Sequence, residues 1–390
     1  MTEPRRIYLD NAATSWPKPE SVYRAVDQAM REWGAPAGRG VYREAVDVER
    51  SVAETRRRVA ELIGVTDPKR IVFTANGTDS LNLALHGLLH PGDHVVTSVI
   101  EHNSVLRPLR FLEQHNGIEV SRIGCDSAGV LDPQAVQQAI RPKTRLVAIV
   151  HASNVTGAIQ PIAAIGQIAR ERGVLFLVDA AQSLGQLPFS VDEVSADLVA
   201  APGHKGLLGP LGTGMLYVGK GVESQLQSVR QGGTGTRSEE DSQPETLPDK
   251  YEAGNHNVPG IAGMGAGVGE LLARGVNAVR THHRNLTARL IEGLRDVQGV
   301  QLTGPANADR QVGVLSLQIN GYDPQDVAAI LESSYRIQIR AGFHCASQTH
   351  RGLGTDVGGG TVRISVGITT TAEDVDATVA AFAEIAASAT

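Results

Sequence analysis

The chain has 390 residues, with 36 basic and 42 acidic side chains and a net charge of −6 at pH 7. This length exceeds one ordinary hydrophobic core, so we expect a large domain and a second, smaller one. The negative net charge argues against a nucleic-acid surface and against an anionic membrane partner. The first 17 residues hold no apolar segment of a secretory signal, and two cysteines cannot form a disulfide framework. The composition therefore favours a cytoplasmic protein.

Short apolar runs alternate with helical patterns between about residues 50 and 220. The runs lie at 70–74, 94–99, 145–152, 174–180, 197–201 and 213–218. Between them, residues 80–90 and 161–173 have the spacing of amphipathic helices. The alternation predicts an α/β fold with a largely parallel sheet that is covered on both faces.

The C-terminal part of the chain has a different pattern. Residues 231–260 are rich in Gly, Pro and acidic side chains, which predicts a long loop with a function. Two helical segments follow, then β-like runs at 313–319 and 361–367 and a final helix from about residue 372. This order predicts a separate α+β unit.

Histidines and cysteines show no metal-ligand spacing, and we predict no metal site. The neighbours His282 and His283 lie in a charged helical pattern and are expected on the solvated surface. Cys125 is expected to fill space as a small hydrophobe. Cys345, in RAGFHCA, is either a similar filler or a reactive thiol, and the local sequence alone leaves both interpretations open.

Lys205 differs from the other five lysines of the chain. It directly follows the apolar run 197–201 and lies among glycines, which leave room for a bulky ligand beside the backbone. The other five, Lys18 among them, lie in polar turns or loops, where solvated charge is a sufficient interpretation. Ligands of parallel sheets bind at the carboxyl ends of the strands, so Lys205 is a candidate functional residue.

Polar side chains of complementary chemistry follow other predicted strands. Asp179 ends one strand with Gln182 just beyond, and Asn154 follows another. Gly77 and Thr78 open a helix whose free N–H groups favour a phosphate, although such a pair is more often only a cap. A lysine, a carboxylate, an amide and a phosphate seat are together the set that pyridoxal phosphate requires.

Motifs along nearly the whole chain resemble a known family. They are YLDNAATSWPKP (8–19), RGVYREA (39–45), NGTDSLNLA (76–84), EHNSVLRP (101–108), HASNVTG (151–157), VDAAQ (178–182), GHKGLLGPLGTG (203–214), EAGNHN (252–257), RAGFHCA (340–346) and VRIS (362–365). The sequence is similar to the class V aminotransferase superfamily of pyridoxal phosphate enzymes. Within it, the sequence resembles the group II cysteine desulfurases, the selenocysteine-lyase-like branch.

The resemblance implies fold type I. A large domain, residues 18–258, would contain a mainly parallel seven-stranded sheet and bind pyridoxal phosphate. A smaller α+β domain, residues 1–17 and 259–390, would carry the cysteine loop. A homodimer is also implied.

The resemblance further implies which residues bind the cofactor. They are Gly77, Thr78, His102, Asn154, Asp179, Gln182, His204, Lys205 and Asn255. Lys205 would bind it covalently, and Asp179 would pair with its ring nitrogen. Gln182 and Asn154 would approach the ring hydroxyl.

The remaining cofactor contacts concern the phosphate and the ring face. Gly77, Thr78 and His204 would hold the phosphate, and His102 would stack on the ring and carry protons. Many relatives have Thr at the position of Asn255, where it reaches the phosphate of the partner subunit. Asn255 could still donate a hydrogen bond there.

Substrate binding and sulfur transfer are implied for the small domain. Arg363 would clamp the substrate carboxylate, since a guanidinium suits bidentate binding, and Asn154 and Arg340 are further candidates. Cys345 would be the nucleophile that becomes a persulfide. Arg340 or a protonated His344 would supply the positive charge that favours a thiolate.

Two other positions depart from the family pattern. Pro202 replaces a serine before Gly-His-Lys, which removes a hydroxyl and an N–H from the phosphate site. Phe343 replaces a residue that is often histidine or leucine, so the polarity beside the cysteine motif differs.

The implied reaction converts L-cysteine to L-alanine and leaves the sulfur on Cys345. A C–S lyase, a selenocysteine lyase or an epimerase on the same scaffold is the nearest alternative, and a lyase needs Lys205 but not Cys345. A transaminase would require a keto acid and gives the cysteine no role. A catalytically silent module that delivers sulfur-pathway partners is the alternative outside enzymes. Expected partners are L-cysteine, a second copy of the chain and a sulfur-acceptor protein, without nucleic acid or membrane.

Overall fold

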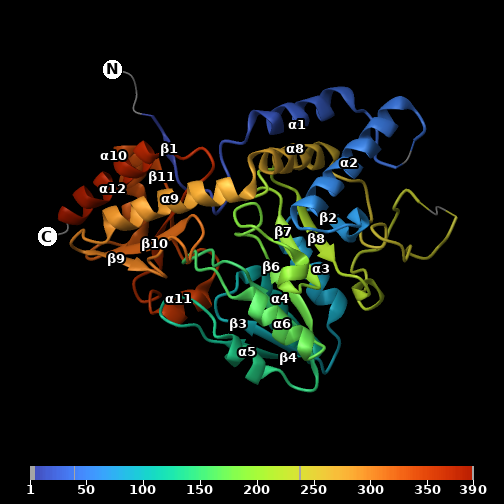
Figure 1. Ribbon diagram of the computed structural model, residues 1–390, viewed down its shortest axis with the longest axis horizontal. Helices are drawn as coiled ribbons and strands as arrows, with labels where there is room; N and C mark the ends of the chain where they lie inside the picture. The colour runs from blue at the N-terminus through green and yellow to red at the C-terminus, as the bar shows by residue number, and fades with distance from the viewer. Residues whose placement is uncertain (1–4, 39, 237–238, 389–390) are drawn as a thin grey trace.

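The computed structural model describes residues 5–38, 40–236 and 239–388. The parts of the predictions above that fall on residues 1–4, 39, 237–238 and 389–390 lie outside the described residues. The chain forms a larger lobe around a seven-stranded sheet and a smaller lobe around a four-stranded sheet (Figure 1).

The large sheet confirms the predicted α/β architecture. Its strands are β2 (Ile71–Thr74), β3 (His94–Ser98), β4 (Glu119–Ile123), β5 (Thr144–Val150), β6 (Leu175–Asp179), β7 (Leu198–Pro202) and β8 (Gly214–Val218). Their order is β2-β8-β7-β6-β5-β3-β4. Strand β8 is antiparallel to both of its neighbours, and all other pairs are parallel. The sheet is therefore mainly parallel.

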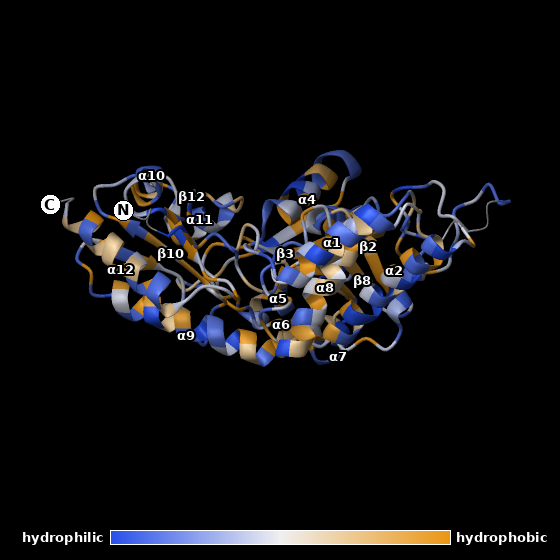
Figure 2. Ribbon diagram, turned by 90° about the horizontal axis from the view of Figure 1, so that it is seen from above, coloured by the Kyte–Doolittle hydropathy of each residue, from blue (hydrophilic) through white to orange (hydrophobic). Residues whose placement is uncertain are grey.

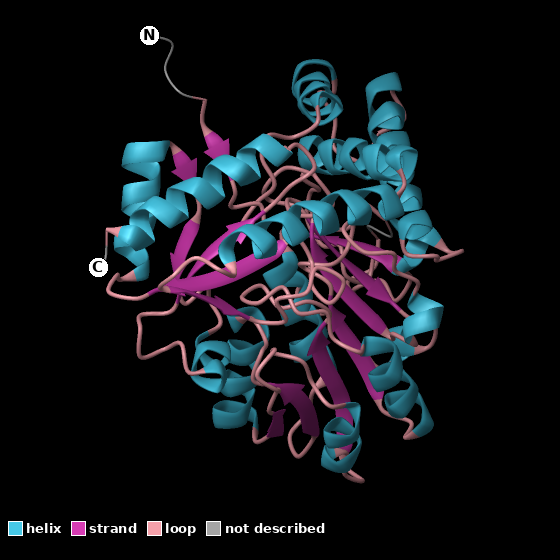
Figure 3. Ribbon diagram, turned by 60° about the vertical axis from the view of Figure 1, so that its left-hand side comes forward, coloured by secondary structure: helices cyan, strands magenta, loops and turns pink. Residues whose placement is uncertain are grey.

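Helices cover both faces of this sheet, as Figure 3 shows. They are α1 (Glu20–Glu32), α2 (Arg43–Leu62), α3 (Gly77–Leu88), α4 (Asn103–Asn116), α5 (Pro133–Ala139), α6 (Ile162–Glu171), α7 (Val191–Val194) and α8 (Val258–Arg274), with short 3-10 helices at Pro68–Arg70 and Val222–Ser224. Successive strand residues point to opposite faces. Accordingly, Val96 and Phe176 belong to one hydrophobic cluster, while Val95 and Leu177 belong to another.

The small lobe contains an antiparallel sheet of order β12-β13-β10-β9. Its strands are β9 (Val300–Thr303), β10 (Val314–Ile319), β12 (Arg340–Gly342) and β13 (Thr361–Ser365), and its helices are α9 (Val276–Leu294), α10 (Pro324–Tyr335), α11 (Ser347–Leu353) and α12 (Ala372–Ala387). The N-terminal strand β1 (Ile7–Tyr8) pairs with β11 (Ile337–Gln338). Strand β1 therefore packs on the small lobe.

Helices α8 and α9 connect the two lobes. Ile261 and Met264 of α8 join the hydrophobic core of the large sheet, whereas Leu286 and Leu290 of α9 join the core of the small sheet. In Figure 2, strands β2, β8 and β10 are mainly hydrophobic, while α9 mixes hydrophobic and hydrophilic residues. These contacts favour a junction near Gly275, and the division at residue 258 stays a prediction.

Burial corrects one expectation for the histidine pair. His283 is only 4% exposed, so its predicted place on the surface is wrong. Burial lowers its pKa to about 3, so His283 is neutral at pH 7. The charged residues around His283 in the sequence led to the prediction of exposure, but in α9 this residue faces the interior.

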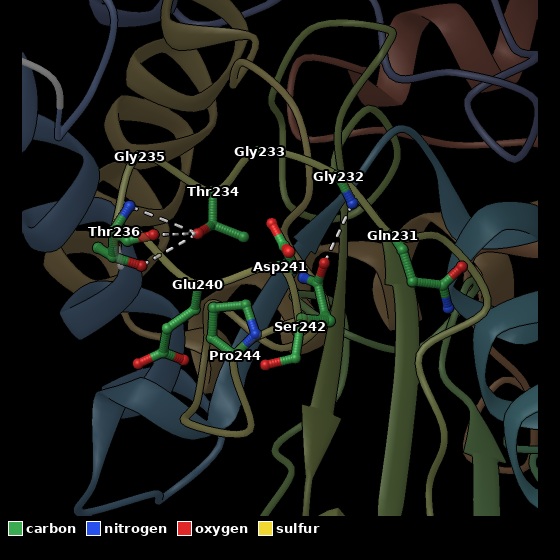
Figure 4. A pocket seen from close by; sticks show the side chains of 11 residues that line it. Gln231, Gly232, Gly233, Thr234, Gly235, Thr236, Glu240, Asp241, Ser242 and Pro244 are labelled. Carbon is green, nitrogen blue, oxygen red and sulfur yellow. Dashed lines mark hydrogen bonds between the residues drawn. The ribbon is translucent and has the colours of Figure 1, made fainter. Parts of the chain in front are cut away.

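The long polar loop forms a cavity of its own. Residues 231–236 and 240–244 line a space of about 580 Å³ (Figure 4). The Gly232 N–H donates to Gln243 Oε1 at 3.0 Å across it. The lining contains none of the predicted site residues, so this cavity is separate from the candidate site.

Within the described ranges, no helix is long and apolar enough to cross a membrane. Among the same residues, no three His, Cys, Asp or Glu side chains are grouped so that they could hold a metal ion.

Candidate active site

A cavity of about 160 Å³ lies at the carboxyl edge of the large sheet. Eight of the nine predicted cofactor-binding residues line it: Gly77, Thr78, His102, Asn154, Asp179, Gln182, His204 and Lys205. Asp179 is the last residue of β6, and the others lie in the segments that follow β2, β3, β5, β6 and β7. The parallel strands thus bring together residues that lie as many as 128 positions apart in the sequence (Gly77 to Lys205).

The start of helix α3 forms one end of the cavity. Asn76 caps the helix, since its side-chain oxygen accepts from the Asp79 N–H at 2.9 Å. The first N–H groups of a helix have no partner within it, so those of Gly77 and Thr78 are available to an anion. A Cβ on Gly77 would come within 3.1 Å of Pro202 Cδ. Pro202 therefore closes this end of the cavity tightly against the glycine.

Asp179 and Lys205 are the charged pair of the cavity. Burial raises the pKa of Asp179, although the Ala181 N–H, 2.9 Å from Oδ1, and Lys205 oppose this effect. Burial lowers the pKa of Lys205 to about 8, and the charge of Asp179 opposes that shift. The amine is therefore much more often neutral at pH 7 than an exposed lysine.

Two histidines border the same cavity. Burial, reinforced by the charge of Lys205, lowers the pKa of both His102 and His204 to about 4. Both rings are therefore neutral at pH 7. The Ser104 N–H donates to His102 Nδ1 at 3.0 Å, which places the ring proton of His102 on Nε2.

Residues 14–18 hold the backbone directly before Lys205. The His204 carbonyl accepts from Lys18 Nζ at 2.8 Å, the Ser15 N–H at 3.0 Å and the hydroxyls of Thr14 and Ser15 at 3.2 Å each. Burial lowers the pKa of Lys18 to about 8. The prediction that Lys18 is a solvated charge is therefore wrong. Its place in the YLDNAATSWPKP motif could have indicated a role in the site.

Arg363 lies on β13 and is 1% exposed. Its Nη2 donates to Asp10 Oδ1 at 2.7 Å, and its Nη1 donates to the Asn154 carbonyl at 3.0 Å. Its Nε is buried without a hydrogen-bond partner among the described residues. The guanidinium is thus fixed on one side and still has a donor to offer. Asp10 was not among the predicted site residues, although it lies in the YLDNAATSWPKP motif.

The loop around Cys345 is strained and firmly tied. His344 and Cys345 have φ angles of 47° and 60°, which cost non-glycine residues about 1–3 kcal/mol each. Asn154 Nδ2 donates to the His344 carbonyl at 2.6 Å, and the Asn103 N–H donates to the Cys345 carbonyl at 2.9 Å. The thiol itself is exposed, so the interpretation as a buried filler is wrong.

The charged neighbour of Cys345 is Arg340, whose Nη2 lies 3.5 Å from Sγ. His344 is buried, and its Nε2 lies 3.0 Å from the Thr361 carbonyl. Burial and the charge of Arg363 lower the pKa of His344 to about 2. The prediction that a protonated His344 supplies positive charge to the thiol is therefore wrong, because burial keeps the ring neutral.

Asn255 lies outside this cavity. It lines a neighbouring space of about 170 Å³ together with Arg230, Glu252 and His256. A contact of Asn255 with the phosphate of a partner subunit stays a prediction.

Gln182 Oε1, His204 Nδ1 and Arg363 Nε are among the buried polar atoms around the site that have no partner among the described residues. Buried polar groups of native proteins are nearly always hydrogen-bonded, so such a cluster fits a ligand that completes it. The N–H groups at the start of α3 could also take an anion, the carboxylate of Asp179 a cationic ring nitrogen, and Arg363 Nε a carboxylate. The residues present therefore fit pyridoxal phosphate and an amino-acid substrate.

The chain is similar to known proteins over nearly its whole length. The family model for aminotransferase class-V matches residues 7–378. A probable cysteine desulfurase of Methanothermobacter thermautotrophicus is 38% identical, with 95% of this chain and 92% of the relative covered. A probable cysteine desulfurase of Pyrococcus abyssi is 34% identical over 95% and 92% of the two chains.

Solved structures give the same result for the fold. The cysteine desulfurase of Thermococcus onnurineus NA1 has a TM-score of 0.91 at 34% identity, with 98% of this chain and 95% of that chain covered. The cysteine desulfurase CsdA of Escherichia coli has a TM-score of 0.88 at 29% identity over 98% and 95%. With its sheet order, its cavity and these similarities, the chain belongs to the aminotransferase class-V family.

Proposed function

We propose that this protein is a pyridoxal phosphate-dependent cysteine desulfurase, which converts L-cysteine to L-alanine and takes the sulfur onto Cys345. One observation carries the proposal: an exposed cysteine on a strained loop is tied through Asn154 to the cavity that contains Lys205. The similar proteins named above, all called cysteine desulfurases, support it.

The cavity residues would hold the cofactor in one orientation. Gly77, Thr78 and His204 would bind the phosphate, and Asp179 would pair with the ring nitrogen at the other end. Gln182 has a free buried oxygen to offer, while its Nε2 is held by the Ala12 carbonyl at 2.9 Å. When bound, pyridoxal phosphate supplies an electron sink that stabilises negative charge at the substrate Cα.

The substrate would bind between Arg363 and Lys205. Arg363 has its Nε free for the carboxylate, and Asp10 together with the Asn154 carbonyl fixes the plane of its guanidinium. Lys205, whose pKa is lowered to about 8, can accept the Cα proton as a neutral amine. His102 presents its Nε2–H as a hydrogen-bond donor.

Sulfur transfer would be carried out by Cys345. Its thiolate attacks the substrate sulfur, so that an S–S bond forms and the C–S bond breaks. The electron pair of the broken bond stays with the substrate carbon, which takes up protons and leaves as alanine. Arg340 Nη2 lies 3.5 Å from the sulfur of Cys345 and can donate to it.

The test is product analysis with matched substrates. We expect the purified protein to form alanine from L-cysteine in amounts equal to the sulfur released by a reductant. L-Serine, which lacks the sulfur, should give no alanine. Pyruvate and ammonia in place of alanine would point to a lyase and would contradict the proposal. The same measurement with L-selenocysteine compares the turnover of the selenium substrate with that of the sulfur substrate.

Cofactor capture should depend on pH through Lys205. Only the neutral amine attacks the aldehyde, so the capture rate of cofactor-free protein should rise about tenfold per pH unit below pH 8. Because the pKa of Lys205 is lowered to about 8, the rate should level off above that value. Stopped-flow absorbance from pH 6 to 10 measures this profile.

Asp179 provides the control for this profile. Its charge raises the pKa of Lys205, so Asp179→Asn should move the plateau to lower pH. A wild-type rate that still increases at pH 10 would contradict the lowered pKa.

The partners follow from the same proposal. L-Cysteine is the substrate, and the exposed thiol of Cys345 is open to a sulfur-acceptor protein. We further propose a homodimer in which Asn255 reaches the phosphate of the partner subunit, and a cytoplasmic location, where two free cysteines remain reduced.

A further inference from the structure

Ser104 links two groups of the cavity that come from different elements. Its hydroxyl lies 2.7 Å from Thr78 Oγ1 on α3 and 2.9 Å from His102 Nδ1 at the start of α4. The residue is 8% exposed and lines the same cavity as Lys205. None of the sequence predictions assigned a role to Ser104.

The backbone N–H and the hydroxyl of Ser104 compete for the same lone pair of His102 Nδ1. His102 Nδ1 has one lone pair, and the backbone N–H of Ser104 already donates to it at 3.0 Å. The hydroxyl proton of Ser104 is thereby left for Thr78, whose oxygen lies at the shorter distance. Thr78 Oγ1 then acts as the acceptor in this pair.

Because Thr78 accepts a hydrogen bond from Ser104, the proton of the Thr78 hydroxyl is free. The free proton can point at an anion beside the N–H groups of Gly77 and Thr78 at the start of α3. If Thr78 donated to Ser104 instead, a lone pair of Thr78 would face the phosphate, whose oxygens are acceptors. Phosphate binding therefore favours one direction of the chain, from Ser104 to Thr78 to the phosphate.

We propose that Ser104 is a positioning residue of the phosphate site, which acts through Thr78. The hydroxyl of Ser104 donates to Thr78 Oγ1, so that the hydroxyl proton of Thr78 points toward the bound phosphate. The inference rests on the proposed function, because it takes the anion at α3 to be the cofactor phosphate. It goes further by naming a residue that sets cofactor affinity through the hydroxyl of Thr78. The backbone N–H of Ser104 separately fixes the tautomer of His102.

The test compares two ligands on the full chain after its cofactor has been removed. Pyridoxal phosphate and pyridoxal both react with Lys205, and only the first bears a phosphate. We expect Ser104→Ala to lower the affinity for pyridoxal phosphate about tenfold, as for one weakened hydrogen bond to a charged group. The affinity for pyridoxal should stay unchanged. Titration of the visible absorbance measures both.

A double-mutant cycle with Thr78→Val tests whether Ser104 acts through Thr78. Valine keeps the shape of threonine and removes the hydroxyl. In the Thr78→Val background, Ser104→Ala should have no further effect on the affinity for pyridoxal phosphate. Independent, additive losses would overturn the inference.

The remaining outcomes are also decisive. An equal loss for both ligands would mean that the substitution disturbs the cavity as a whole, and it would overturn the inference. Unchanged affinity for pyridoxal phosphate in Ser104→Ala would do the same while leaving the proposed function intact. Failure of the wild-type chain to bind pyridoxal phosphate at all would instead overturn the proposed function.

Discussion

A Cys345→Ala variant is expected to lose alanine formation from L-cysteine by a factor on the order of 10³ or more, the scale seen when a covalent nucleophile is removed. The reason is that no other exposed thiol lies at the cavity: Cys125 is half-buried against the core of the large sheet. The variant should keep the visible absorbance of the bound cofactor, because Cys345 does not line the cofactor cavity. Alanine analysis and an absorbance spectrum measure the two effects.

The matched control is Cys125→Ala, which removes the other cysteine. Its turnover should equal that of the wild type. Full sulfide release by Cys345→Ala would assign the reaction to a lyase that needs no thiol, and would rule out Cys345 as the nucleophile.

A Lys205→Ala variant is expected to lose both the visible absorbance of the covalently bound cofactor and the turnover. Loss of a positioned proton acceptor alone costs about 10²–10⁴ in rate, and here the covalent attachment is lost as well. The fold should persist, since Lys205 contributes no side chain to a hydrophobic cluster. Absorbance of the purified protein and alanine analysis provide the measurement.

Lys220→Ala serves as its control, because Lys220 is exposed in the turn after β8. Spectrum and turnover of this variant should match the wild type. An unchanged spectrum in Lys205→Ala would refute the assignment of Lys205 as the covalent attachment point.

The strands of the large sheet that are buried on both faces could be predicted from the sequence. Strands β5, β6 and β7 are nearly continuous apolar runs, and their polar neighbours, Asn154, Asp179 and Lys205, necessarily meet at one edge. Strand β4 was not among the predicted runs. It is an edge strand with half-exposed, alternating polar residues, EVSRI, which carry no such signal.

The electrostatic state of the site could not be predicted, because burial determines it. His344 stands beside arginines in space, and its surroundings keep it neutral. Lys18 has the sequence context of a solvated residue, yet it donates to a carbonyl 186 positions away. The hydroxyl contact of Ser104 with Thr78 likewise joins two helices whose relative placement only the fold defines.

The most direct test of sulfur transfer to Cys345 follows the sulfur atom itself. Wild-type protein is given one equivalent of L-cysteine without a reductant, its thiols are then alkylated, and the peptide that contains Cys345 is analysed by mass. A desulfurase with Cys345 as its nucleophile should show one extra sulfur atom on Cys345 and one equivalent of alanine. Alanine without sulfur on that peptide, or sulfur on Cys125 instead, would contradict it.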